Sequence, residues 1–113
     1  MASRILLVED NPASLELMRY LLQSDGHAVL LANDGQQAIG HLATGPESLP
    51  ALVLTDIQMP GLDGYQLLAH IRSDARLHAL PVVALTAYSM PGDQERVMRA
   101  GFDGYLSKPI DPE

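Results

Sequence analysis

One central stretch of the chain decides the fold: Leu52-Val53-Leu54-Thr55-Asp56-Ile57-Gln58-Met59-Pro60-Gly61-Leu62-Asp63-Gly64. It begins with an apolar run of the length of a β-strand, and this run ends at the carboxylate of Asp56. Pro60 and Gly61 then predict a turn, and Asp63-Gly64 predicts the start of a helix. We therefore expect Asp56 at the tip of a buried strand, where a carboxylate can bind a metal, act as a nucleophile or simply begin a loop.

Strand and helix patterns alternate along the rest of the chain. Apolar runs predict strands over residues 4–8, 27–32, 52–55, 81–85 and 103–107. Amphipathic segments with capping signals predict a helix that starts at Asn11-Pro12 and others over 36–43, 64–76 and 92–100. Several strands are almost entirely apolar, which indicates a parallel sheet buried on both faces. The prediction is an α/β fold: a three-layer αβα sandwich with a five-stranded parallel sheet and right-handed crossovers.

The composition describes one acidic domain without cysteine. The 113 residues are enough for one domain and too few for two, and 47% of them are hydrophobic. The lack of cysteine excludes disulfides and thiolate zinc sites, and no apolar run reaches the roughly 18 residues of a membrane span. We therefore expect a cytoplasmic protein without a membrane partner. The formal net charge of −7 repels phosphate backbones, so we expect no direct binding to nucleic acid.

Polar residues follow the expected strands at the edge where ligands bind in parallel α/β sheets. Glu9 and Asp10 come after the first strand, and Asp56 ends the third. Thr86 follows the fourth strand and Lys108 follows the fifth. We expect all of these side chains to face one shallow pocket.

The charges of this group favour a cation and a phosphoryl group. Three neighbouring carboxylates repel one another unless a cation lies between them, and Mg2+ prefers oxygen ligands of this kind. Lys108 adds a positive charge, and Thr86 adds a hydroxyl donor. Together with the cation, they would neutralise a phosphoryl group bound to Asp56.

Several short motifs, in this order along the chain, are similar to those of a known family: Leu7-Val8-Glu9-Asp10-Asn11, Asp56-Ile57-Gln58-Met59-Pro60 with Asp63-Gly64, Leu85-Thr86-Ala87, and Tyr105-Leu106-Ser107-Lys108-Pro109. The chain resembles the receiver domain of two-component response regulators from Ile5 to Pro109. The likeness is greatest to receivers that stand alone or belong to hybrid sensor kinases. The resemblance implies the flavodoxin-like strand order 2-1-3-4-5 and a place in a phosphorelay.

The resemblance also implies roles for single residues. Asp56 would accept a phosphoryl group from a histidine kinase or a histidine phosphotransfer protein. The domain would then be a signalling phosphoacceptor and not an enzyme, assisting only its own phosphorylation and dephosphorylation. Asp10 and Asp56 would bind Mg2+ through their side chains. The backbone carbonyl of Gln58 would complete the protein ligands, and Glu9 would act through a metal-bound water.

A switch is implied by the same likeness. Lys108 would pair with the phosphoryl oxygens, and Thr86 would swing toward them. Tyr105 would turn inward behind Thr86 and alter the face formed by the fourth helix and the fifth strand. A downstream effector protein would read this change, which is a two-state element biased by a local change of charge.

Other functions fit parts of the pattern. A Mg-dependent aspartyl phosphohydrolase of the haloacid-dehalogenase type also has a strand-end aspartate. Its general acid lies two residues later, where this chain has Gln58, and glutamine cannot donate and recover a proton. A docking receiver that works without phosphorylation is disfavoured because no member of the phosphorylation set is missing. A flavodoxin-type flavin binder fits the fold. It is disfavoured because Glu9 and Asp10 would face the cofactor phosphate and because the hydroxyl-rich loop that should bind this phosphate is absent.

The end of the chain departs from the family pattern. Receivers finish with a fifth helix packed on the sheet, whereas only Ile110-Asp111-Pro112-Glu113 follow Lys108-Pro109. We therefore expect residues 1–113 to form one receiver domain whose C-terminal helix is truncated, so that the fifth helix is largely absent. Apolar surface beside the first helix would then be exposed, which predicts lower stability or association.

Overall fold

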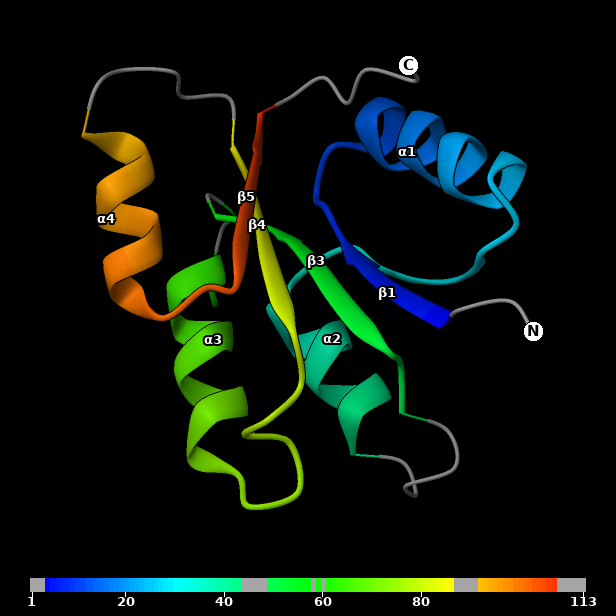
Figure 1. Ribbon diagram of the computed structural model, residues 1–113. Helices are drawn as coiled ribbons and strands as arrows, with labels where there is room; N and C mark the ends of the chain where they lie inside the picture. The colour runs from blue at the N-terminus through cyan, green and yellow to red at the C-terminus, as the bar shows by residue number, and fades with distance from the viewer. Residues whose placement is uncertain (1–3, 44–48, 58, 60, 87–91, 108–113) are drawn as a thin grey trace.

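A five-stranded parallel sheet forms the centre of the computed structural model, which describes residues 4–43, 49–57, 59, 61–86 and 92–107 (Figure 1). The strands are β1 (Arg4–Val8), β2 (Ala28–Ala32), β3 (Leu52–Asp56), β4 (Val82–Thr86) and β5 (Gly104–Ser107). Their order across the sheet is β2-β1-β3-β4-β5, and every neighbouring pair is parallel. The predicted fold class and the implied strand order are both confirmed.

Helices lie on both faces of this sheet. They are α1 (Pro12–Ser24), α2 (Gly35–Leu42), α3 (Gly64–Ser73) and α4 (Asp93–Ala100). α1 packs on one face, and α2, α3 and α4 pack on the other, which makes the predicted three layers (Figure 1). Within the described ranges, no helix has the length and apolar character needed to cross a membrane. The expectation about a fifth helix falls on residues 108–113, which lie outside the described residues.

Alternate side chains of β1 enter different layers of the core. Leu6 and Val8 belong to the larger apolar cluster, which includes residues of α2, α3 and α4. Ile5 and Leu7 belong to the smaller cluster, which includes residues of α1. All of these side chains are buried. Because both faces of the strand are shielded from water, its sequence is apolar throughout and does not alternate.

Side-chain caps begin α1, α2 and α3, whereas Gly92 before α4 makes no side-chain cap hydrogen bond. Asn11, directly before α1, accepts a hydrogen bond from the backbone N–H of Ser14 at 3.0 Å. Asp63, directly before α3, forms a reciprocal capping box with Gln66, with hydrogen bonds of 2.9 and 3.0 Å. These caps satisfy backbone donors that the first helical turn leaves without partners. The caps therefore fix the residues at which these helices begin.

The predicted length of α3 was wrong at its C-terminal end. We expected this helix to continue to about residue 76, but it ends at Ser73, and Asp74 has extended backbone angles of φ −95° and ψ 123°. The carboxylate of Asp74 accepts a hydrogen bond from the backbone N–H of Arg76 at 2.8 Å. An aspartate that takes a local backbone donor in this way competes with helical hydrogen bonding, so the helix stops before Asp74.

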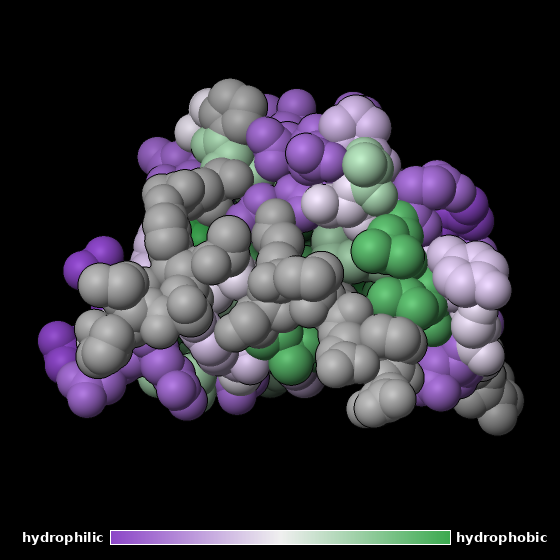
Figure 2. All heavy atoms as spheres, turned by 90° about the horizontal axis from the view of Figure 1, so that it is seen from above, coloured by the Kyte–Doolittle hydropathy of each residue, from purple (hydrophilic) through white to green (hydrophobic). Residues whose placement is uncertain are grey.

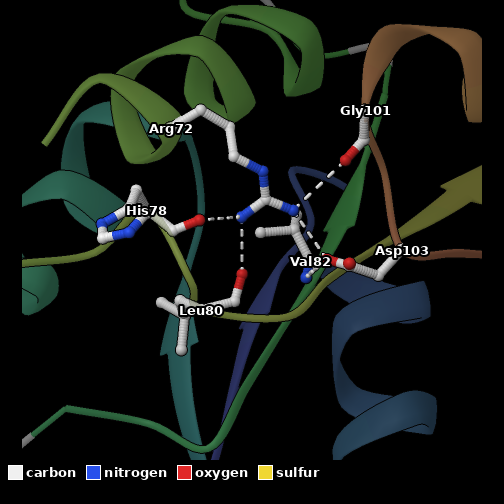
Figure 3. A network of polar contacts seen from close by, with 6 residues as sticks. All are labelled: Arg72, His78, Leu80, Val82, Gly101 and Asp103. Atoms are coloured by element: carbon white, nitrogen blue, oxygen red, sulfur yellow. Dashed lines mark hydrogen bonds and ion pairs between the residues drawn. The ribbon is translucent and has the colours of Figure 1, made fainter. Parts of the chain in front are cut away.

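The guanidinium group of Arg72 ties the end of α3 to two other segments of the chain (Figure 3). One of its nitrogens donates to the backbone carbonyls of His78 and Leu80, at 3.1 and 2.7 Å. The other nitrogen donates to the carbonyl of Gly101, at 3.2 Å, and to the carboxylate of Asp103, at 2.6 Å. A planar guanidinium group can serve several acceptors at once because its donors diverge in one plane.

Asp103 extends this network to the sheet. The carboxylate oxygen that accepts from Arg72 also accepts from the backbone N–H of Val82, at 2.8 Å. Val82 is the first residue of β4, so the network lies at the end of the sheet opposite the carboxyl ends of the strands. It joins α3, the start of β4 and the turn between α4 and β5.

Replacing Arg72 by lysine should destabilise the fold. An ammonium group cannot reach the same spread of acceptors, so the change Arg72→Lys should lower the free energy of unfolding by about 1–3 kcal/mol. Urea denaturation followed by circular dichroism measures this difference. Arg99→Lys is the matched control, because Arg99 and its partner Glu95 are each 79% exposed and 3.7 Å apart. Equal stability of the two variants would contradict a structural role for the network.

Candidate functional site

The carboxyl ends of β1, β3 and β4 are aligned at one edge of the sheet. The register pairs Val8 with Thr55, and it pairs Asp56 with Leu85. The backbone N–H of Ile57 continues the pairing by donating to the carbonyl of Leu85 at 3.1 Å. Figure 2 shows the molecule from this end, with hydrophilic residues around much of its margin and hydrophobic residues toward the right. Residues that follow these strands are therefore neighbours in space although they are distant in sequence.

Three carboxylates meet at this edge. Glu9 is 0% exposed and Asp56 is 6% exposed, whereas Asp10 is exposed to solvent. One carboxylate oxygen from each residue lies within 4.8 Å of the others. The structure thus brings together the three acidic residues that the sequence analysis selected from two different strands.

The donor set of this cluster fits a hard divalent cation. All three groups offer oxygen, and like charges at this separation raise the free energy of the folded state unless a cation or protons neutralise them. Mg2+ typically takes one or two carboxylates and keeps several of its waters. Exposure of Asp10 leaves one side of the cluster open to solvent, where such waters have room.

The other predicted site residues fall into two groups. Thr86, the last residue of β4, is 2% exposed, and Tyr105 in β5 is partly buried against the larger apolar cluster. The register pairs Tyr105 with Ala84, which lies two residues before Thr86. Because side chains two apart in a strand share a face, Thr86 and Tyr105 lie on the same face of the sheet. Lys108 and Gln58 lie outside the described residues.

Two buried glycines at this edge were not predicted as parts of the site. Gly35 is the first residue of α2, and Gly64 is the first residue of α3. The sequence analysis assigned Asn33-Asp34-Gly35 to no site, and it took Asp63-Gly64 as a helix start and as part of a family motif but gave it no role in the site. The available signal was that both helices begin with the same dipeptide, an aspartate cap followed by glycine.

The comparison with known families agrees with this fold and site. Residues 5–113 match the sequence model of the family described as "Response regulator receiver domain". The chain belongs to this family, the receiver domains of two-component systems, which confirms the family that the motifs indicated. Receiver domains act in signalling, with histidine kinases and downstream effectors as their general partners.

Named relatives differ in length. Response regulator Rre1 of Synechocystis sp. is 44% identical over 110 residues, which cover 96% of this chain and 46% of Rre1. Polar-differentiation response regulator DivK of Brucella ovis is 36% identical over 110 residues, which cover 97% of this chain and 87% of DivK. The chain thus matches most of one relative and less than half of another.

Solved structures with the same fold include receivers that hold divalent metals. The receiver domain of sensor histidine kinase PA1611 from Pseudomonas aeruginosa PAO1 is 36% identical, with a TM-score of 0.86, and the match covers 99% of this chain and 89% of that one. That structure has a magnesium ion coordinated in its active-site cleft. Response regulator Rcp1 in its Mn2+-bound form is 30% identical, with a TM-score of 0.80, and the match covers 96% of this chain and 83% of Rcp1.

Removing one carboxylate should change stability in opposite ways with and without Mg2+. In EDTA, Asp10→Asn should raise the free energy of unfolding by about 1 kcal/mol, because it relieves repulsion among like charges. In millimolar Mg2+, the parent should gain stability by ligand binding and the variant should gain little. Thermal unfolding under both conditions measures the two differences. Asp25→Asn is the control, since the Asp25 side chain is 83% exposed. A destabilised Asp10→Asn protein in EDTA would contradict the electrostatic account.

Proposed function

We propose that this chain is a phosphoacceptor receiver in a two-component phosphorelay, with Asp56 as the acceptor. The observation that carries the proposal is the strand-end position of Asp56, almost fully buried with an oxygen within 4.8 Å of oxygens of Glu9 and Asp10. Membership of the receiver family supports the same role. The phosphoryl donor is a phosphohistidine on a histidine kinase or on a histidine phosphotransfer protein.

The transfer forms one bond and breaks one. A carboxylate oxygen of Asp56 attacks the phosphorus atom, a P–O bond forms, and the P–N bond to the imidazole of the donor breaks. The imidazole nitrogen keeps the electron pair of the broken bond and takes a proton. Negative charge on the transferring group has to be neutralised for this to be fast. The buried position of Asp56 keeps bulk water from screening these interactions.

The residues around Asp56 have separate tasks in this proposal. Asp10 and Asp56 would hold Mg2+ through their side chains, the backbone carbonyl of Gln58 would be a further ligand, and Glu9 would act through water. Mg2+, when bound, supplies neutralisation of charge on the phosphoryl oxygens. Lys108 pairs with those oxygens as a positive charge. No separate substrate is turned over, so the chain assists only its own phosphorylation and dephosphorylation.

Phosphorylation is proposed to change a protein-binding face. The hydroxyl of Thr86 moves toward the phosphoryl group, and Tyr105 turns inward on the same face of the sheet. These movements shift the equilibrium between two arrangements of α4 and β5. The exposed apolar side chains of Met98 on α4 and Leu106 on β5, each 43% exposed, lie on the elements that would meet a downstream effector.

Intact-mass measurement after incubation with acetyl phosphate and Mg2+ tests the proposal. The parent should gain one phosphoryl group that is stable in acid and released in base, as expected of an acyl phosphate. EDTA should prevent the gain, because the like charges of the site are then not neutralised. Asp56→Asn should show no gain at all.

Asp25→Asn serves again as the control and should be phosphorylated like the parent. Asp25 is the C-cap residue of α1 and lies away from the carboxylate cluster. A parent protein that binds Mg2+ but never gains mass would contradict the proposal and favour docking without phosphorylation. Continuous release of phosphate from a donor, many times per protein molecule, would favour the phosphohydrolase instead.

A further inference from the structure

We propose that Gly35, the first residue of α2, is a positioning residue for the Asp56 site. Its lack of a side chain lets α2 lie directly against Leu62, two residues before the start of α3, which contacts the peptide of Asp56. This inference rests on the proposed function, because Asp56, whose peptide the start of α3 contacts, is the proposed phosphoacceptor and a proposed Mg2+ ligand. A failure of the positioning role and a failure of the proposed function give different experimental results.

The space at Gly35 is closed by Leu62. A Cβ atom added to Gly35 would lie 2.4 Å from Cδ2 of Leu62, 2.7 Å from its backbone carbonyl oxygen and 2.9 Å from its Cβ. Such contacts are far shorter than the roughly 3.5–4.0 Å at which non-bonded atoms attract. Gly35 has no positive φ, so the backbone conformation by itself does not require glycine there. The requirement is for a close approach between two segments.

Gly64, the first residue of α3, makes a similar close approach to the end of β3. A Cβ atom there would lie 2.5 Å from the backbone carbonyl oxygen of Asp56 and 2.8 Å from Cα of Ile57. The backbone N–H of Gly64 donates to the carbonyl of Ile57 at 2.8 Å. The first residue of α3 therefore rests on the peptide of the phosphoacceptor, while the first residue of α2 rests on Leu62.

Hydrogen bonds and core packing fix the start of α2. The side chain of Asp34 accepts from the backbone N–H of Gln37 at 2.9 Å, and the side chain of Gln37 accepts from the backbone N–H of Asn33 at 2.7 Å. Ala38 and Leu42 anchor the same helix in the larger apolar cluster. An added Cβ atom at residue 35 would therefore force the start of α2 and Leu62 apart.

Gly35→Ala tests the inference, with Gly40→Ala as the matched control. Both glycines lie in α2, but a Cβ atom at Gly40 would meet nothing within 4 Å. Gly35→Ala should weaken Mg2+ binding and slow phosphorylation by acetyl phosphate by roughly 10- to 100-fold, as small displacements of reacting groups do. Gly40→Ala should leave both unchanged. In EDTA, the amide NMR resonances of Ile57 and Gly64 should shift in the first variant only.

A merely structural role for Gly35 predicts a different result. Gly35→Ala would then lower the melting temperature but leave the Mg2+ dissociation constant and the amide resonances of Ile57 and Gly64 as in the parent, and this would overturn the inference. The double variant Gly35→Ala/Gly40→Ala guards against loss of folding, because alanine at residue 40 favours the helix. A double variant that still does not fold would overturn it as well, since Gly35 would be required for the fold itself.

A rescue experiment distinguishes the contact of Gly35 with the backbone of Leu62 from its contact with the side chain of Leu62. Leu62→Ala removes Cδ2 but leaves the carbonyl oxygen and Cβ of residue 62 in place, so it should restore at most part of the Mg2+ affinity lost in Gly35→Ala. Full restoration would overturn the claim that Gly35 acts through close contact with the backbone of residue 62. A parent that binds Mg2+ but takes up no phosphoryl group would overturn the proposed function, whereas weaker Mg2+ binding in Gly35→Ala would still support the positioning role.

Discussion

Burial of both faces of a parallel sheet is the constraint on which the rest of this structure depends. Parallel strands need helical crossovers, and the helices of this chain shield the sheet on both sides, so that β1 is apolar at every inner position. Since all strands run the same way, the polar residues at and just after their carboxyl ends gather at one common edge. Glu9, Asp56 and Thr86 are buried there.

The two ends of the sheet have different physical roles. At the carboxyl end, three acidic groups within 4.8 Å of one another oppose folding until a cation joins them. At the opposite end, Arg72 and Asp103 bind backbone groups of several segments and stabilise the fold. The contacts that hold α3, β4 and the turn before β5 together therefore lie at the end of the sheet opposite Asp56.

The sequence analysis predicted the elements and the carboxylate cluster because both depend on local patterns. Strand-length apolar runs and helix caps are read within a few residues, and the position of a carboxylate after a strand places it at the edge. The end of α3 was missed because the side chain of Asp74 took a backbone donor that the pattern of apolar residues does not reveal. Gly35 was missed because its need for glycine arises from Leu62, a residue of another loop.

The sequence by itself determined the α/β class, the receiver family and which residues end the strands, because apolar periodicity and ordered motifs are properties of single segments. Only the tertiary structure decided how closely those segments approach. The separation of the carboxylate oxygens and the shared face of Thr86 and Tyr105 depend on how the strands pair, and the contact of Gly35 with Leu62 depends on how α2 packs. Packing of this kind is set by many side chains at once, so no single segment of the sequence encodes it.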